Sequence, residues 1–124
     1  MPVRLLHSSV LIWPKADEVR EALRQWAERA KDEHPELRGV GYFGSYARGD
    51  WGVGSDLDIV LVLESSRLPR QERGVLWDTT SLPVPVDLFI YTLPEWREIM
   101  ASGSRFAAML KGETRWVFTS PGCR

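Results

Sequence analysis

Hydrophobic residues in the first part of the chain recur at the spacing of one helical face. The stripe lies within about residues 15–33 and consists of Val19, Ala22, Leu23, Trp26, Ala27 and Ala30. This stripe predicts an amphipathic helix that buries one side. Pro14 suits the first helical position, and the helix is expected to end at His34 because the residue before a proline avoids helical backbone. Residues 3–13 predict a short strand or an irregular arm.

Apolar runs without helical spacing follow, and they predict strands. They cover residues 37–43, 57–63, 84–91 and 115–119. The run that follows Asp58 is unbroken and gives the strongest strand signal of the sequence. Pro85 has no N–H for a sheet hydrogen bond, which places the start of the third strand at a sheet edge or at the entry to the strand.

Helical patterns between these runs complete the order of elements. They predict short helices over residues 71–78, 94–100 and 105–111, and a first helical turn over 46–48. The order predicts an α+β or α/β domain with one small sheet. A chain of 124 residues is long enough for one core but not for two. We therefore expect a single domain over residues 1–124, with its core between about 13 and 118 and a flexible C-terminal tail over 119–124.

Composition and charge narrow the classes of function. The chain is 44% apolar and 27% charged, as ordinary globular domains are, and its net charge of −1 gives no general field that attracts nucleic acid. No apolar run approaches the roughly 20 residues needed to span a bilayer, and no signal-peptide cleavage pattern is present. The single cysteine, Cys123, fits a reducing compartment. We expect a cytoplasmic protein with no membrane association and no general nucleic-acid binding.

Three carboxylates at predicted strands indicate a metal site. Side chains alternate along a strand, so Asp56 and Asp58 point to one face and Leu57 to the other. Two carboxylates on one face repel each other unless a cation lies between them, and oxygen ligands of this kind select Mg²⁺ or Mn²⁺. Asp87 lies within another apolar strand and needs a partner there, which a shared metal site would supply. Three such carboxylates could hold two metal ions.

A glycine–serine turn before these carboxylates indicates phosphate binding. Gly44 at a strand end lets the backbone approach a phosphate closely, and the N–H groups of the following turn bind phosphate oxygens. The Ser45 hydroxyl adds a donor, and Arg48 lies one turn later, where it could neutralise phosphate charge.

Simpler interpretations exist for each of these features. An Asp-x-Asp pair is common, and a lone Gly-Ser pair is usually only a turn. Asp50 is interpreted as a solvated or turn residue. Of the six tryptophans, only Trp51 lies where it could stack on a base, and the others suit a core or an interface.

The combination of these motifs resembles a known superfamily. Gly44-Ser45, followed after ten residues by Asp56-Leu57-Asp58 and later by Asp87 in a strand, is similar to the DNA polymerase β-like nucleotidyltransferases. The short form looks like the minimal nucleotidyltransferases (MNT) of prokaryotes. The resemblance extends over residues 13–118 and includes the runs 42–49 and 110–113.

The resemblance implies a fold, a reaction and a role for each motif residue. The fold would be a small mixed sheet backed by helices, and the reaction would use two Mg²⁺ ions and a nucleoside triphosphate such as ATP. Asp56 and Asp58 would bind the metals, and Asp87 would be the third carboxylate, which helps to activate the acceptor hydroxyl. Gly44 and Ser45 would hold the β- and γ-phosphates.

The length of the chain implies that the acceptor lies elsewhere. Many members of the superfamily carry a second domain for the acceptor, so we expect an acceptor site from another copy of this chain or from another protein. Minimal nucleotidyltransferases are commonly paired with a small all-helical HEPN protein in toxin–antitoxin modules. Some of these antitoxins transfer AMP from ATP to a tyrosine of the toxin.

Three hypotheses about function follow. The first is an antitoxin that transfers a nucleoside monophosphate to a hydroxyl of a HEPN toxin. The second is a binding module that neutralises its partner by contact alone, which the abundance of tryptophan favours. The third is transfer to a small molecule, as in antibiotic modification.

Overall fold

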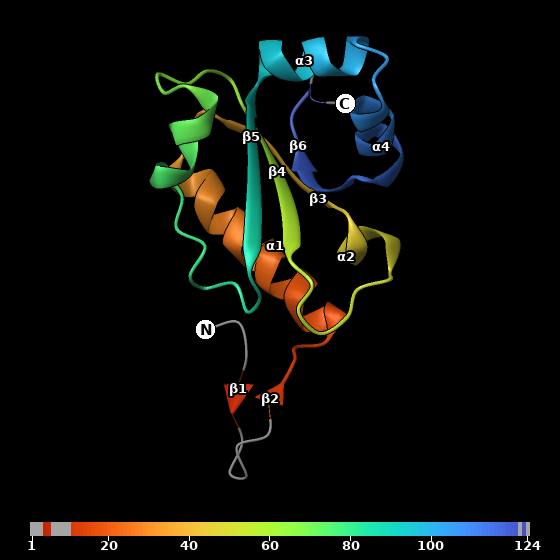
Figure 1. Cartoon of the computed structure of the whole chain (residues 1–124). Coiled ribbons are helices and arrows are strands. Elements are labelled where there is room, and N and C mark those ends of the chain that lie inside the picture. The colour runs from red at the N-terminus through yellow and green to blue at the C-terminus, as the bar shows by residue number, and fades with distance from the viewer. Residues whose placement is uncertain (1–3, 6–10, 122, 124) are drawn as a thin grey trace.

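A four-stranded mixed sheet forms the centre of the computed structural model (Figure 1), which describes residues 4–5, 11–121 and 123. The strands are β3 (Leu37–Phe43), β4 (Leu57–Leu63), β5 (Val86–Thr92) and β6 (Arg115–Thr119). Their order is β5-β4-β3-β6, with β4 and β5 parallel and the other pairs antiparallel. Two very short strands, β1 (Arg4–Leu5) and β2 (Leu11–Ile12), form a separate antiparallel pair.

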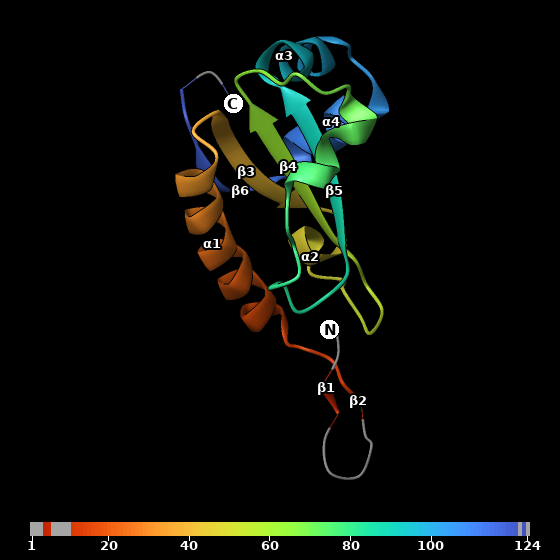
Figure 2. The same cartoon turned by 90° about the vertical axis from the view of Figure 1, so that its left-hand side faces the viewer.

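Helices cover both faces of this sheet. They are α1 (Ala16–Glu33), α2 (Ser45–Arg48), the 3₁₀ helix η1 (Arg70–Leu76), α3 (Leu93–Ala101) and α4 (Arg105–Glu113). Figure 2 shows α1 along one face, whereas α3 and α4 lie on the other side of the sheet, where β4 and β5 end. The expected α+β class, with one small mixed sheet backed by helices, is confirmed. Among the described residues, no helix is long and apolar enough to cross a membrane.

The apolar stripe of α1 packs as the sequence predicts. Five of its six members are buried, and they are Val19, Leu23, Trp26, Ala27 and Ala30. The helix begins at Ala16, two residues after Pro14, and Lys15 is its N-cap. Pro14 therefore lies before the cap and not at the first helical position. It is fully buried there.

The central strand β4 is buried on both faces. Leu57, Ile59 and Leu61 belong to the core beneath α1, while Val60 and Val62 belong to a second core beneath α3 and α4. A strand covered on both sides needs an unbroken apolar run, which explains its strong signal in the sequence. The strand therefore holds its first residues in a rigid frame.

Two boundaries differ from the sequence predictions. The third strand starts at Val86, so Pro85 lies just before it, where its carbonyl accepts a hydrogen bond of 2.8 Å from Leu57 N. The expected edge position is confirmed, because β5 is the first strand of the sheet order. The short helix expected over residues 71–78 is a 3₁₀ helix over Arg70–Leu76.

The C-terminal residues differ from the expected flexible tail where the structure describes them. Thr119 belongs to β6, and Ser120 N donates to the Arg38 carbonyl at 2.7 Å. The Cys123 side chain is fully buried. The backbone carbonyl of Cys123 accepts a hydrogen bond of 2.6 Å from the Trp96 indole N–H. The buried indole requires such an acceptor, which fixes the chain at Cys123.

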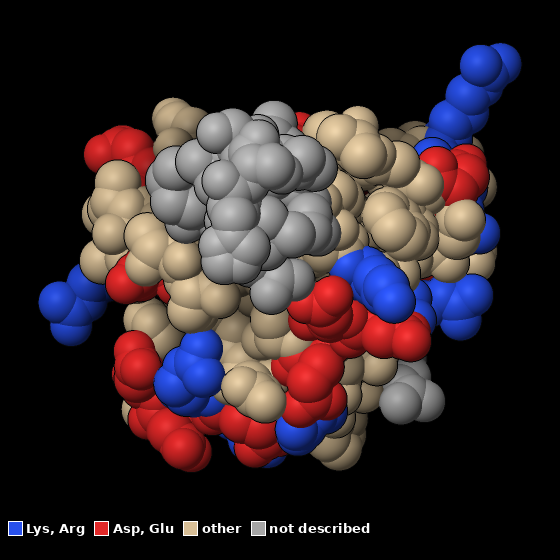
Figure 3. All heavy atoms as spheres, turned by 90° about the horizontal axis from the view of Figure 1, so that it is seen from below, with Lys and Arg blue, Asp and Glu red and all other residues tan. Residues whose placement is uncertain are grey.

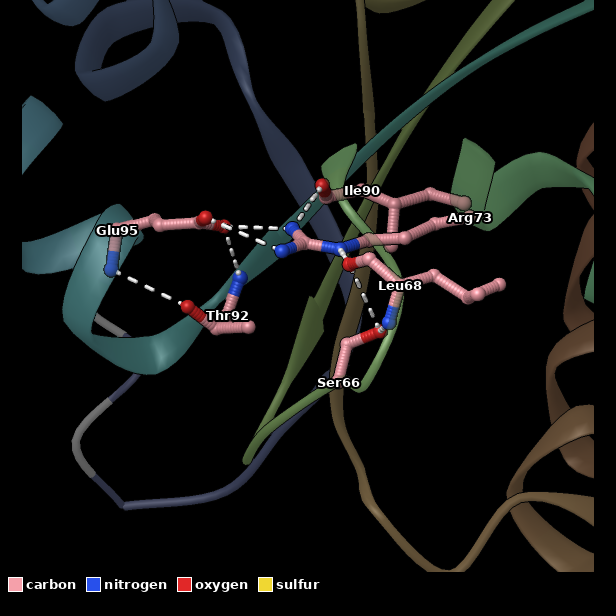
Figure 4. Close-up of polar contacts among 6 residues, drawn as sticks. All are labelled: Ser66, Leu68, Arg73, Ile90, Thr92 and Glu95. Carbon is pink, nitrogen blue, oxygen red and sulfur yellow. Dashed lines mark hydrogen bonds and ion pairs between the residues drawn. The ribbon is translucent and has the colours of Figure 1, made fainter. Parts of the chain in front are cut away.

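A buried arginine connects η1 to the end of β5 and to α3 (Figure 4). The Arg73 side chain is 6% exposed. Its terminal nitrogens donate to the two Glu95 carboxylate oxygens at 2.6 and 3.1 Å, and it also donates to the carbonyls of Leu68 and Ile90. Glu95 in turn accepts from Thr92 N at 2.9 Å and so caps α3. The hydrogen bonds from Arg73 and Thr92 lower the pKa of Glu95 to about 2.

Glu95→Ala is expected to lower the free energy of unfolding by about 2 kcal/mol, because it leaves the buried Arg73 cation without its partner. The expected loss is smaller than the usual cost of breaking a buried ion pair because the Glu95 side chain is 35% exposed. Since the folded-state pKa is depressed, the contribution is present above pH 4.5 and is lost as the pH falls towards 2. Urea unfolding at pH 7 and at pH 3 measures it, with the exposed Glu98→Ala on the same helix as control. An equal loss in both variants would contradict the prediction.

Candidate active site

Two of the three predicted carboxylates lie side by side at the start of the parallel strand pair. Asp58 and Asp87 are direct partners in the register of β4 and β5, so their side chains project from the same face of the sheet. Asp56 lies two residues before Asp58, just outside β4. Asp58 is partly buried, whereas Asp56 and Asp87 are exposed. The fold therefore brings three carboxylates together where β4 and β5 begin, beside solvent.

These carboxylates repel each other. The pKa of Asp58 is raised to about 6, first because burial disfavours its charge and then because of the negative charges of Asp87 and Asp56. Arg48 acts in the opposite direction. Within the part of the chain that the structure describes, no three carboxylate, histidine or cysteine side chains converge closely enough to hold a metal ion as they stand. The three carboxylates are electrostatic neighbours, but they do not form a closed ligand cage.

The glycine turn lies directly against Asp58. Gly44 adopts φ 77° and ψ −151°, a backbone conformation that is essentially restricted to glycine. A Cβ at this position would overlap Asp58 Oδ2 and would lie 3.3 Å from Asp58 Cγ. Only glycine therefore lets the turn and the carboxylate approach each other in this way.

The short helix α2 starts at this turn and presents its first N–H groups there. Ser45 is its first residue, and the first N–H groups of a helix have no acceptor within the helix. The Gly44 carbonyl closes the turn by accepting from Ala47 N and Arg48 N at 3.0 and 2.9 Å. Arg115 fixes α2 from the other side through a 2.9 Å hydrogen bond to the Ala47 carbonyl.

Arg48 is held by two carboxylates. Its Nε donates to Asp50 at 3.1 Å, so Asp50, expected to be a solvated or turn residue, has a defined partner. Its Nη1 donates to Glu113 Oε1 at 3.1 Å, and Gly44 N donates to the same oxygen at 3.3 Å. Figure 3 shows acidic side chains beside basic ones on the face where β4 and β5 begin.

Glu113 is the site residue that sequence reasoning missed. The run 110–113 resembles the family pattern, but the sequence assigns no role to its last member, Glu113. Glu113 ends α4 and lies far from Gly44 in the sequence, so no local spacing connects the two. Only the packing of α4 and β6 beside β3 brings them together.

The loop between α2 and β4 is anchored by aromatic residues. Trp51 stacks on Tyr46 with ring centres 5.7 Å apart and planes at 7°. Tyr46 is buried, and its hydroxyl accepts from the Trp13 indole N–H at 3.1 Å. Trp51, expected as the one candidate for stacking on a base, thus has one ring face against the core. Val53 in the same loop is 84% exposed.

The sequence matches a family model described as a nucleotidyltransferase domain over residues 23–108, which is more than half of the chain. A comparison with curated proteins finds no match. The matched segment begins in α1 and ends in α4, so it contains the glycine turn and all three carboxylates.

Solved structures share this fold at low sequence identity. A Sulfolobus solfataricus protein assigned to the nucleotidyltransferases superposes with a TM-score of 0.59 at 19% identity, over 84% of this chain and 83% of that chain. A toxin–antitoxin structure with AMP-PNP gives a TM-score of 0.50 at 16% identity, over 87% and 76%. A mutant of the toxin–antitoxin MntA–HpeT gives 0.50 at 18% identity, over 80% and 73%. These matches confirm the expected nucleotidyltransferase fold.

Proposed function

The chain belongs to the nucleotidyltransferase domain family, and from that premise we propose that it transfers a nucleoside monophosphate, AMP from ATP, to a hydroxyl group of a partner protein. The observation that carries this proposal is the direct contact of the glycine turn with Asp58, which is in register with Asp87. A phosphate-binding turn in contact with a pair of carboxylates suits a triphosphate that binds with divalent cations.

In this proposal Asp56, Asp58 and Asp87 hold two Mg²⁺ ions, with Mn²⁺ as an alternative. The residues fit such ions, because the ligands are hard oxygens and because positive charge would offset both the burial of Asp58 and the repulsion from Asp87 and Asp56, which together raise its pKa. When bound, the ions would neutralise the triphosphate and help to ionise the acceptor hydroxyl. Asp87 is exposed at the sheet edge, and there it would accept the proton of the incoming hydroxyl.

The glycine turn holds the triphosphate in this proposal. The N–H groups at the start of α2 and the Ser45 hydroxyl would donate to oxygens of the β- and γ-phosphates. Arg48 would add positive charge once it is released from its present partners. Positioning and charge neutralisation carry most of the catalysis in phosphoryl and nucleotidyl transfer, and these residues supply both.

For the acceptor, we propose a toxin of the small all-helical HEPN kind. The resemblance to minimal nucleotidyltransferases supports this choice. The shared fold with a toxin–antitoxin structure that contains AMP-PNP is consistent with it. The chain would then act as the antitoxin, and AMP on a hydroxyl of the toxin would block its activity. A second copy of this chain is the alternative source of the acceptor site.

Labelled ATP tests this function directly. The chain is incubated with Mg²⁺ and with a small helical protein encoded beside it, using ATP labelled at either the α- or the γ-phosphate. Transfer of AMP labels the partner from α-labelled ATP only. Asp58→Asn should abolish the labelling, whereas Asp32→Asn on the exposed face of α1 should preserve it. Labelling from the γ-phosphate would indicate a kinase reaction and would contradict the proposal.

A second candidate function is neutralisation of the partner by contact alone. Val75 and Leu76, which are adjacent in η1 and 80% and 55% exposed, favour it, because contiguous exposed apolar side chains mark interaction surfaces. In that case Asp58→Asn would neutralise the toxin as well as the wild type does. Turnover of a small hydroxyl compound by the isolated chain would instead support the third hypothesis, transfer to a small molecule.

A further inference from the structure

The carboxylate of Glu113 lies where the proposed function places a triphosphate. Its Oε1 accepts from Gly44 N at 3.3 Å and from Arg48 Nη1 at 3.1 Å. Both donors belong to the glycine turn and short helix that would bind phosphate. The Glu113 side chain is 26% exposed and reaches the turn from the last position of α4.

We propose that Glu113 is an internal competitor of the triphosphate, and that its carboxylate must leave the glycine turn before the nucleotide binds fully. The proposal rests on the proposed function, because it takes the turn at Gly44 as the phosphate site. It adds a form of regulation that the motif itself does not contain. The affinity for nucleotide is then set partly by a residue of α4.

The chemistry of the donors supports this competition. Carboxylate and phosphate oxygens are recognised by the same N–H donors, and one backbone N–H makes one strong hydrogen bond at a time. Arg48 is already paired with both Asp50 and Glu113, so its charge is balanced before any nucleotide arrives. A triphosphate that entered with Glu113 in place would meet a negative charge and an occupied donor.

The release of Glu113 needs only a local change. The residue stands at the C-terminal end of α4, after Gly112 and before the extended residue Thr114. A rotation of its long side chain would free Gly44 N and Arg48 without moving the sheet. The second connection between this region and α2, from Arg115 to the Ala47 carbonyl, would remain. The competition is therefore compatible with an intact fold.

Glu113→Gln tests the proposal through binding. Glutamine keeps an oxygen that accepts from Gly44 N and Arg48, but it removes the charge. Calorimetric titration with ATP and Mg²⁺, and separately with inorganic triphosphate and Mg²⁺, should give about fivefold tighter binding than wild type, the effect of one unit charge at about 4 Å in water. Glu98→Gln, exposed on α3, is the matched control and should bind like the wild type. Urea unfolding of each variant checks that the fold is retained.

Other outcomes separate the alternatives. Weaker binding by Glu113→Gln would mean that Glu113 orients Arg48 for the phosphate, and unchanged binding would mean that it has no part in the site. Either result overturns the competition. Glu113→Asp keeps the charge but is one methylene shorter, so it should also bind more tightly. If Glu113→Asp binds nucleotide with wild-type affinity, the hydrogen bonds from Gly44 N and Arg48 to this carboxylate do not limit binding. That result would overturn the proposal as well.

The failure of the proposed function has a different signature. If neither the wild type nor Glu113→Gln binds ATP or triphosphate with Mg²⁺, the phosphate site itself is wrong and both proposals fall. If the wild type binds and the Glu113 variants do not bind more tightly, only the competition fails.

Discussion

Asp58→Asn is expected to lower the rate of nucleotidyl transfer by on the order of 10³-fold, which corresponds to about 4 kcal/mol of transition-state stabilisation. Asp58 is the one carboxylate that contacts the glycine turn and also pairs with Asp87 in the sheet. An amide in its place cannot neutralise a metal ion. The rate of label transfer from α-labelled ATP measures the loss, and a variant within tenfold of the wild type would contradict the metal site.

The same substitution is expected to raise the free energy of unfolding at pH 7 in the presence of EDTA. The folded-state pKa of Asp58, about 6, lies above its ordinary value of 3.8. Ionisation therefore costs stability, and the cost develops as the pH rises from about 4 to 6. Asparagine removes it, so the difference between variant and wild type should be present at pH 7 and absent at pH 3.5. Mg²⁺ with ATP should then stabilise the wild type more than the variant.

Gly44→Ala is expected to lower the free energy of unfolding by about 3 kcal/mol and to abolish transfer. Its backbone conformation costs any other residue about 1–3 kcal/mol, and the added Cβ would overlap Asp58 Oδ2. The turn would have to move away from the carboxylate, which would separate the proposed phosphate donors from the proposed metal ligands. Urea unfolding and label transfer measure the two effects.

Gly49→Ala is the matched control for this prediction. Gly49 also has a positive φ, 86°, but among the described residues no atom beyond its two chain neighbours lies within 4 Å of a Cβ built there. Its substitution should cost only about 1–2 kcal/mol, the cost of left-handed backbone, and should preserve transfer. In the double variant Gly44→Ala with Asp58→Ala, the part of the loss caused by overlap should disappear. Equal losses for Gly44→Ala and Gly49→Ala would contradict the close approach of turn and carboxylate.

The candidate residues of the donor side follow from local features of the sequence. The Asp-x-Asp spacing keeps Asp56 close to Asp58, although Asp56 lies just before β4 and not in it, and an apolar run on each side of Asp87 makes it a strand residue. The parallel pairing of their strands, which puts Asp87 beside Asp58, did not follow from periodicity and is seen only in the structure. The unbroken run of β4 also follows directly from its position between two cores.

Contacts between distant elements were beyond the reach of the sequence. Nothing in the pattern connects Glu113 with Gly44, or Arg73 with Glu95, because each pair depends on how two elements pack in space. The sequence predicts only a helix that contains Glu95 and a short helix that contains Arg73, and not their contact. The C-terminal residues read as a tail for the same reason, since the indole that binds the Cys123 carbonyl belongs to α3.

The parallel pairing of β4 with β5 has a consequence for how this protein can vary. The separation of Asp58 from Asp87 is set by the hydrogen-bonded spacing of neighbouring strands, about 4.8 Å, and not by the packing of any one side chain. Core residues can therefore exchange for others of similar volume, and the segment between the two strands can lengthen, without moving the two carboxylates apart. A single residue inserted in β5 after Asp87 would instead turn Asp87 to the opposite face, because the rest of the strand keeps its register. Tolerance to insertion should thus change abruptly at Asp87.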